Sequence, residues 1–342
     1  MRAGREALAE AALARLDAGD REGALVLLLA DQDDWWRGPT AQPDALRELV
    51  CGQHSLSLRQ AMALLSWGPV ADYFAHRWSD PTFLAGLALV EAHWQAPRSA
   101  FELACGIGHH LRALADQGVA VTGADVVFAK LWVARHWVVP SATLICVDAA
   151  QEWNLSGRFD LVACHDAFYF LEPKAGIGAR LKGLLAPGGV LAIGHVHNRE
   201  FPNLSAGIGM SAAELGEVFP GGIVYDDAEL TRALAEGRAP APSAQNELAD
   251  VEAFAIAAGP GLRPPRAVSG GLALPPPGAA LARNPLYGGD GIVNWPSPRY
   301  REEYGQRATY PMASNAPLTA RHDAAHEVQA RRRELVHLPE RW

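Results

Sequence analysis

The hydrophobic positions of the chain change their spacing twice, and each change marks a different kind of structure. Up to about residue 95, apolar residues recur at helical spacing, as in ALAEAALARL and EGALVLLLADQ, and glycines are few. This spacing predicts a helical N-terminal segment over residues 1–95. Asp20, in the DAGD turn between the two stretches, is placed to cap the second helix.

Short apolar runs alternate with helical patterns between about residues 98 and 200. The runs are SAFELAC, VAVTGAD, ATLICVDA, FDLVACH and VLAIGHV, and the helical patterns extend from HHLRALADQG to PKAGIGARLKGLLAPGG. Strands that are apolar on both faces and separated by helices are typical of a parallel sheet covered on both sides. The pattern therefore predicts an α/β fold with a doubly wound, mostly parallel sheet.

The remainder of the chain has weaker periodicity. SAAELGEVF, DDAELTRALAEG and the final TARHDAAHEVQARRREL are predicted helices, and GPGLRPPRAVSGGLALPPPGAA is predicted to be irregular. Residues 284–312 contain four tyrosines and a tryptophan, a composition that predicts an ordered extension packed on the body of the protein. These changes divide the chain into a helical segment (1–95), a ligand-binding domain (96–258) and a Pro/Gly-rich linker with an aromatic extension (259–342).

Composition narrows the classes of partner. The net charge is −8, and apart from Arg331-Arg332-Arg333 the basic residues are scattered, which argues against a nucleic-acid partner. The four cysteines form no CxxC pair, and three of them fall in apolar runs, which is typical of a reducing compartment. We find no signal-peptide pattern and no stretch of about 18 apolar residues. We therefore expect a cytoplasmic protein that does not enter membranes.

The stretch FELACGIGHH places two glycines, Gly106 and Gly108, directly after the first predicted strand. Open α/β folds bind ligands at this edge of the sheet, and glycines there let backbone N–H groups approach a ligand closely. Asp125 ends the second predicted strand, where nucleotide-binding folds hold a ribose diol. The histidines that follow the turn, His109 and His110, are either close to the ligand or exposed to solvent.

These residues carry a family resemblance. ELACGIG resembles the first motif of the class I S-adenosylmethionine-dependent methyltransferases, in which an acidic residue precedes glycines at alternate positions. Glu102, Gly106 and Gly108 match that motif, whereas Ala104 stands where the family has its first glycine. CVDAAQ, FDLVACHDAFYFL and LKGLLAPGGVLAI resemble the later motifs in unbroken order, so the resemblance covers about 100 residues.

The resemblance implies a Rossmann-like methyltransferase fold with a seven-stranded sheet and S-adenosylmethionine as cofactor. It implies the following cofactor-binding residues: Glu102, Ala104, Gly106, Gly108, Asp125, Val126, Asp148, Ala149 and His165. Within this set, Glu102 would face the ammonium group, Asp125 the ribose hydroxyls and Asp148 the adenine amine. A dinucleotide would instead bring a pyrophosphate to the turn, and Glu102 would repel it.

Methyl transfer requires an oriented acceptor, and an oxygen or nitrogen acceptor also requires a base. The candidate catalytic residues lie after the fourth and fifth predicted strands: His165, Tyr169, His195 and His197. Because His195 and His197 alternate along a strand, they are expected to point to opposite faces unless the strand has ended. Asp166 beside an HxH pair suggests a metal, but a hydrogen-bonded role is favoured, so no metal is predicted.

The acceptor pocket is expected to form outside the sheet. The candidate contributors are Tyr73, His76 and Arg77 on one side, and NREFPNLSAGIGM with Tyr287, Trp295, Tyr300 and Tyr304 on the other. We expect a small-molecule acceptor methylated at oxygen, and the sequence leaves open whether the protein is a homodimer. Two alternatives remain: an NAD-dependent oxidoreductase, and a non-catalytic methyltransferase-like partner module.

Overall fold

The computed structural model describes residues 5–32, 39–153, 155, 157–202 and 207–342. Its centre is a seven-stranded sheet with the order β3-β2-β1-β4-β5-β7-β6. The strands are β1 (Ser99–Leu103), β2 (Ala120–Asp125), β3 (Thr143–Cys146), β4 (Phe159–His165), β5 (Leu185–His197), β6 (Ile223–Asp226) and β7 (Ala253–Ala258). In this sheet β7 runs antiparallel to β5 and β6, and the other neighbours are parallel. The predicted α/β class with a doubly wound, mostly parallel sheet is confirmed.

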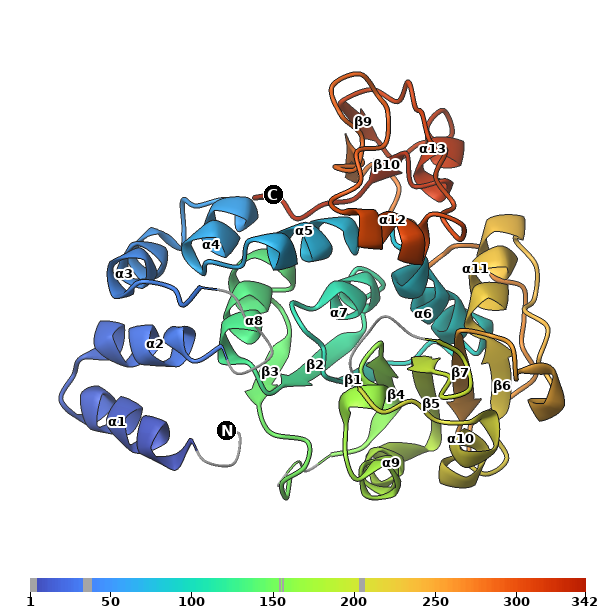
Figure 1. Ribbon diagram of the computed structural model, residues 1–342, viewed down its shortest axis with the longest axis horizontal. Helices are drawn as coiled ribbons and strands as arrows, with labels where there is room; N and C mark the ends of the chain where they lie inside the picture. Colours follow the sequence, from blue (N-terminus) through green and yellow to red (C-terminus); the bar gives the residue numbers. More distant parts are fainter. Residues whose placement is uncertain (1–4, 33–38, 154, 156, 203–206) are drawn as a thin grey trace.

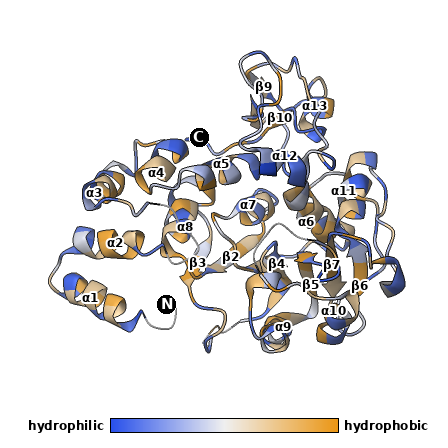
Figure 2. Ribbon diagram, viewed as in Figure 1, coloured by the Kyte–Doolittle hydropathy of each residue, from blue (hydrophilic) through white to orange (hydrophobic). Residues whose placement is uncertain are grey.

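Helices cover both faces of the sheet (Figure 1). One face packs against α6 (Pro81–Ala92), α7 (His109–Ala115) and α11 (Asp227–Glu236), and the other against α9 (Lys174–Gly183) and α10 (Ala212–Val218). The strands are coloured as hydrophobic in Figure 2, whereas the helices carry hydrophilic residues on their outer sides. Burial of apolar surface on both faces of the strands is therefore the main stabilising contribution to this domain.

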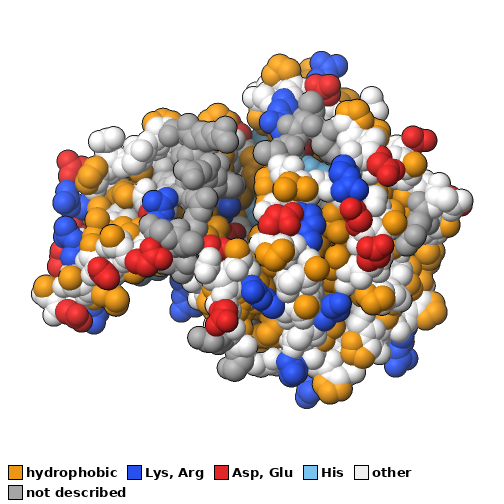
Figure 3. Space-filling view, turned by 60° about the horizontal axis from the view of Figure 1, so that its bottom comes forward, with side chains coloured by type: hydrophobic (Ala, Val, Ile, Leu, Met, Phe, Trp, Pro, Cys, Tyr) orange, Lys and Arg blue, Asp and Glu red, His pale blue; other side chains and the backbone are white. Residues whose placement is uncertain are grey.

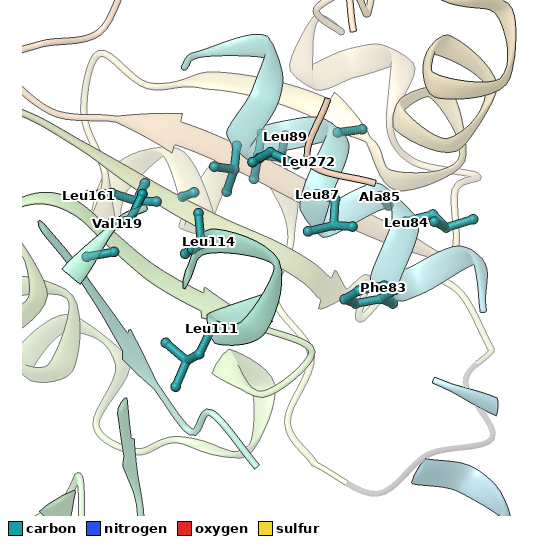
Figure 4. Close-up of a cluster of buried hydrophobic side chains, with 14 of the residues drawn as sticks. Phe83, Leu84, Ala85, Leu87, Leu89, Leu111, Leu114, Val119, Leu161 and Leu272 are labelled. Atoms are coloured by element: carbon teal, nitrogen blue, oxygen red, sulfur yellow. The ribbon is translucent and has the colours of Figure 1, made fainter. Parts of the chain in front are cut away.

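The helix α6 is buried on every side. Its sequence, PTFLAGLALVEA, is apolar all round, which suits a helix enclosed by other elements. Asp80 caps its start by accepting a hydrogen bond from the Phe83 amide at 2.7 Å. Figure 4 shows Leu87 of α6 in the same apolar cluster as Leu111 and Leu114 of α7. This helix therefore belongs to the core that supports the sheet, although it precedes β1 in sequence.

In the described part of the chain before α6, the helices are α1 (Glu6–Asp17), α2 (Arg21–Ala30), α3 (Pro43–Gly52), α4 (Leu58–Leu64) and α5 (Pro69–His76). The first four extend from one side of the body (Figure 1) and pack near α8 (Phe128–Val133), which continues into the π-helix η1 (Ala134–Val138). The predicted cap at Asp20 is confirmed, because its side chain accepts a hydrogen bond from the Gly23 amide at 2.8 Å.

The C-terminal extension forms a second, three-stranded sheet in the order β10-β8-β9. Its elements are β8 (Ala280–Arg283), α12 (Pro298–Tyr304), β9 (Thr319–Arg321), α13 (Glu327–Arg331) and β10 (Leu335–Val336). The helix predicted over TARHDAAHEVQARRREL is wrong, since only α13 is helical there. The ends of that stretch pair with β8 from both sides, so strand pairing overrides the local helical pattern.

The extension is anchored on the body by Glu91, the penultimate residue of α6. The buried Glu91 carboxylate accepts hydrogen bonds from the amides of Ser269, Gly271 and Leu272 and from the Ser269 hydroxyl, at 2.7–3.2 Å. Tyr287, Tyr300, Tyr304 and Tyr310 are buried. The aromatic residues of the extension thus pack in the interior of the structure, and the division of the chain into three domains stays a prediction.

Charged side chains of both signs are interspersed with hydrophobic ones over the face shown in Figure 3. The described helices include none with the length and apolarity needed to cross a membrane.

Candidate active site

The turn between β1 and α7 combines left-handed backbone with open space. Ala104, Gly106 and Gly108 have φ angles of +56°, +57° and +87°. A side chain at Gly106 would meet only Phe74, at 4.0 Å, whereas one at Gly108 would approach Val139 within 2.7 Å. Gly108 is therefore required for packing, and Gly106 leaves room beside the backbone. Ala104, the departure from the family motif, keeps the left-handed conformation that favours glycine.

Asp125 connects this turn to the end of β2. One carboxylate oxygen accepts a hydrogen bond from the Gly106 amide at 3.0 Å, and the other accepts from the Val127 amide at 2.9 Å. The side chain is almost entirely buried. Because a carboxylate oxygen has two lone pairs, each oxygen retains one for a ligand hydroxyl.

Glu102 is buried beneath the turn at the end of β1. One of its oxygens lies 3.2 Å from Nδ1 of His110, and the other has no hydrogen-bond partner among the described residues. Burial raises the pKa of the Glu102 carboxyl to about 7 and lowers the pKa of His110 to about 3. His109 and His110 are both buried, so the alternative that they are exposed to solvent is wrong.

Three further predicted cofactor residues, Val126, Asp148 and Ala149, follow the ends of β2 and β3. The Asp148 carboxylate accepts a hydrogen bond from the Ala150 amide at 2.9 Å, and Ala149 is buried beside it. Val126 follows Asp125 and is half-buried. Parallel β1, β2 and β3 therefore present their predicted ligand residues along one edge of the sheet.

A second polar group lies at the ends of β4 and β5. Asp166 directly follows β4 and accepts hydrogen bonds from the hydroxyls of Tyr169 (2.8 Å) and Tyr73 (3.1 Å). The Arg77 guanidinium lies 3.0 Å from Asp166 and 3.3 Å from Asp80. Burial alone would raise the pKa of Asp166, but Arg77 and His195 outweigh it and lower that pKa. This carboxylate is thus charged and is held by groups from α5, from the residue that follows α5 and from the short segment after β4.

His195 lies at an irregularity in β5. Its φ is +52°, and the register between β5 and β7 shifts between Ile193 and Val196, as expected for a β-bulge. Nδ1 of His195 lies 2.9 Å from Asp227, the first residue of α11, while Nε2 lies 3.9 Å from Asp166. Burial opposes the charged imidazolium, but Asp227 outweighs it and raises the pKa of His195.

His197 joins the same group, contrary to the expectation that His195 and His197 would face opposite sides of the strand. The bulge breaks the strict alternation, so the two rings lie 5.2 Å apart between centroids and nearly perpendicular. His197 stacks on the Tyr169 ring at 3.7 Å, with 14° between the planes. Its pKa falls to about 4 because the ring is largely buried.

His165 lies elsewhere. It packs against His110 with 4.3 Å between ring centroids, and Gly86 and Gly194 provide the space for its ring. Neither ring nitrogen has a hydrogen-bond partner among the described residues, and burial lowers the pKa of His165 to about 3. The structure therefore places His165 near His110 and Glu102, below the glycine turn, and not with Asp166, His195 and His197.

The C-terminal extension closes over this second group. Tyr300 of α12 packs on His76 at 5.3 Å between ring centroids, and Arg307 lies 3.5 Å from Asp227. The hydroxyls of Tyr300 and Tyr310 are buried without a hydrogen-bond partner among the described residues. The predicted contribution of NREFPNLSAGIGM is described only in part, because residues 203–206 lie outside the described residues.

Sequence reasoning missed Asp227 and Arg307. Asp227 was interpreted only as part of an acidic first turn of a helix, and Arg307 lies in a stretch considered for its tyrosines. Tertiary packing brings Asp227 against His195, and Arg307 against Asp227. The only local signal was the pair of adjacent aspartates at the start of α11.

Comparison with known proteins gives one family match: residues 100–189 match the model described as "Methyltransferase domain". Trans-aconitate 2-methyltransferase of Methylobacterium radiotolerans is 32% identical over 132 residues, which cover 38% of this chain and 49% of that protein. Ubiquinone biosynthesis O-methyltransferase of Pasteurella multocida is 27% identical over 154 residues, which cover 41% of this chain and 62% of that protein. The chain thus spans about half to two thirds of the length of these relatives.

Among solved structures, the SAM-bound amino pentose methyltransferase of Micromonospora echinaspora aligns with 28% identity and a TM-score of 0.32, covering 36% of this chain and 54% of that one. An alignment of this extent does not by itself establish a shared fold. The architecture of the present protein rests on its own strand order.

Proposed function

Because residues 100–189 belong to the methyltransferase domain family, we propose that this protein transfers a methyl group from S-adenosylmethionine to an oxygen atom of a small molecule. One observation carries the proposal. The edge of the sheet that holds the glycine turn and Asp125 also holds a buried group of hydrogen-bonding side chains around Asp166, so a cofactor site and an acceptor site adjoin.

The residues of the first site fit the cofactor. The space beside Gly106 admits the methionine end, and the unpartnered oxygen of Glu102 is available to its ammonium group. The free lone pairs of Asp125 suit the two ribose hydroxyls, and Asp148 suits the adenine amine. When bound, the sulfonium supplies an electrophilic methyl group. An acidic residue beneath the turn fits an ammonium group better than a pyrophosphate.

An oxygen acceptor is supported by the polar character of the second site. A hydroxyl or carboxyl acceptor forms hydrogen bonds, and the buried groups available to it include the hydroxyls of Tyr300 and Tyr310 and the imidazole of His195. The acceptor oxygen provides the electron pair of the new O–C bond, the C–S pair remains on sulfur, and a hydroxyl proton leaves to the surroundings. By its name the Pasteurella relative is an O-methyltransferase, which agrees with this choice.

A small acceptor is supported by the enclosure of the site. Asp166 is only 10% exposed, and α5, the end of β5 and the C-terminal extension surround it. A protein or nucleic-acid strand would need a wider approach. We further propose that the protein acts in the cytoplasm, because its cysteines suit a reducing compartment.

The test is calorimetric titration with S-adenosylmethionine, S-adenosylhomocysteine and NAD, using wild type, Asp125→Asn and Asp160→Asn. In Asp125→Asn the amide nitrogen must face one of two backbone donors, so we expect the affinity for both adenosyl ligands to fall at least tenfold. Asp160 is the matched control because only one of its oxygens is used, at the opposite end of the sheet, and an asparagine oxygen can replace it.

Binding of NAD in place of the adenosyl ligands would overturn the proposal in favour of an oxidoreductase. Binding of none of the three would favour a non-catalytic module. Equal loss in the two variants would indicate general damage to the sheet, and a thermal melt of each variant separates that case from loss of a specific contact.

A further inference from the structure

Three potential metal ligands converge at the ends of β4 and β5. Asp166, His195 and His197 each offer one ligand atom, and these atoms lie within 4.8 Å of one another. The parallel pairing of β4 with β5, in which His165 is opposite Gly194, brings the residues after that register to the same edge. Two imidazoles and one carboxylate form a donor set that divalent first-row metals bind, with further coordination positions left open.

The backbone at this cluster departs from regular strand geometry at two of the three ligands. Asp166 and His195 have φ angles of +50° and +52°, although neither is a glycine. Left-handed backbone at such residues is costly and is concentrated at functional sites. Together with the bulge, the left-handed backbone at His195 turns this side chain to the side of the sheet on which His197 and Asp166 lie.

Side chains behind the three residues fix the orientation of each of them. Asp227, only 1% exposed, lies 2.9 Å from Nδ1 of His195 and thereby directs Nε2 toward Asp166. Tyr169 donates a hydrogen bond to Asp166 and stacks on His197, so it orients two ligands at once. A carboxylate behind a ligating histidine is the usual companion of a metal centre, because it sets the tautomer and raises the basicity of the ring.

The charges around the cluster leave room for a cation. When the imidazoles of His195 and His197 are neutral, as metal ligands must be, three carboxylates, those of Asp80, Asp166 and Asp227, face only two guanidinium groups, those of Arg77 and Arg307, and all five side chains are largely buried. Arg77 contacts the Asp166 oxygen that also accepts from Tyr73, and the other oxygen is the one that faces His195. An ion at this position would offset negative charge that burial makes costly.

We propose that Asp166, His195 and His197 bind one divalent transition-metal ion, such as Zn²⁺, whose open positions face the acceptor. This proposal replaces the sequence-based expectation that the HxH pair is only hydrogen-bonded. It rests on the proposed function in one respect: the ion would coordinate the acceptor oxygen and lower the pKa of its hydroxyl, so that the proton is released to solvent before the O–C bond forms.

The experiment is binding of Co²⁺ and Zn²⁺ to the full chain after dialysis against a chelator. Calorimetry gives the stoichiometry, and the visible absorption of Co²⁺ reports its coordination. Wild type should bind one ion per chain, and the spectrum should indicate nitrogen and oxygen ligands. His197→Gln and Asp166→Asn should abolish this binding. Asp227→Asn should weaken it about 10–100-fold, because the carboxylate that orients His195 is lost.

His326→Ala is the matched control, because His326 also pairs with an aspartate but is exposed, in the C-terminal extension. It should leave stoichiometry and affinity unchanged. Wild type that binds Co²⁺ no more tightly than His197→Gln would overturn the proposal and leave His195 and Asp227 as an acid–base pair. Titration of the metal-free protein with S-adenosylmethionine keeps the two ideas apart, since loss of cofactor binding there would count against the proposed function and not against the ion.

Discussion

The carboxylate of Asp227 lies 2.9 Å from Nδ1 of His195, and both side chains are almost completely buried. The two residues are 32 positions apart in the chain, on α11 and β5. A buried carboxylate that holds one ring nitrogen determines where the other nitrogen points, and here it points to Asp166. Asp227 therefore sets the orientation of His195 at the proposed acceptor site, whether His195 binds a metal ion or a proton.

Asp227→Asn should lower kcat about 10–100-fold while leaving the dissociation constant for S-adenosylmethionine within about twofold of wild type. The amide still fills the space but no longer enforces the same ring orientation. The measurement is steady-state kinetics on an identified acceptor together with calorimetry. Asp226→Asn, at the neighbouring cap of α11, should change neither value. Parallel loss of cofactor affinity in Asp227→Asn would instead indicate a structural role.

Glu102 should make the protein less stable as the pH rises from about 4.5 to about 7. Burial raises its folded-state pKa to about 7, above the unfolded value near 4.5, so the folded protein binds more protons over this interval. The expected loss of unfolding free energy is about 3 kcal/mol. Urea unfolding at several pH values, compared between wild type and Glu102→Gln, isolates this contribution. Identical pH slopes in the two proteins would contradict the pKa assigned to Glu102.

Binding of S-adenosylmethionine near pH 6 should release a proton from Glu102. Below a pKa of about 7 the carboxyl is mostly protonated, and a ligand ammonium group beside it favours the charged form. Calorimetry in buffers with different ionisation enthalpies measures the proton count directly. Glu102→Gln should bind without this release. A wild-type protein that releases no proton would mean that the ammonium group does not approach Glu102.

Ala104→Gly should leave stability unchanged or raise it by up to about 1 kcal/mol. The substitution relieves left-handed strain at φ +56° but increases the entropy of the unfolded chain, and the two effects oppose each other. Ala100→Gly, in the regular and buried part of β1, should cost about 1 kcal/mol. Thermal and urea unfolding of the two variants provide the comparison. If Ala104→Gly lowered the free energy of unfolding by more than Ala100→Gly does, strain at Ala104 would be disproved.

Gly86→Ala should destabilise the protein by about 1–3 kcal/mol, because its Cβ would lie 2.6 Å from the His110 ring and 3.1 Å from His165. Gly176→Ala, inside α9, would meet only Pro173 at 3.4 Å and should stabilise by about 0.5–1 kcal/mol. We expect the two Gly→Ala substitutions to change the free energy of unfolding in opposite directions, and urea unfolding of each variant measures the change. A neutral Gly86→Ala would show that the two histidines can move apart.

Local pattern was sufficient wherever one segment determines its own structure. The runs from SAFELAC to VLAIGHV predicted strands because their apolar residues leave no polar face. The sheet confirms each strand, although β3, at the edge of the sheet, is only half-buried. The glycine turn and Asp125 followed from their places at strand ends. The last predicted helix failed because β8, about 40 residues earlier in sequence, pairs with both of its ends.

The sequence alone was sufficient for the α/β class, and it predicted a ligand-binding edge and residues suited to a nucleoside, since each depends on short-range periodicity or on position at a strand end. Only the tertiary structure decided which polar residues meet. In the folded chain a bulge in β5 places His195 beside His197, and His165 lies apart from both. Folding also brings Asp227, Arg77 and Arg307 to this cluster. Such contacts join segments far apart in the chain, and local propensity carries no information about them because burial and pairing are properties of the whole fold.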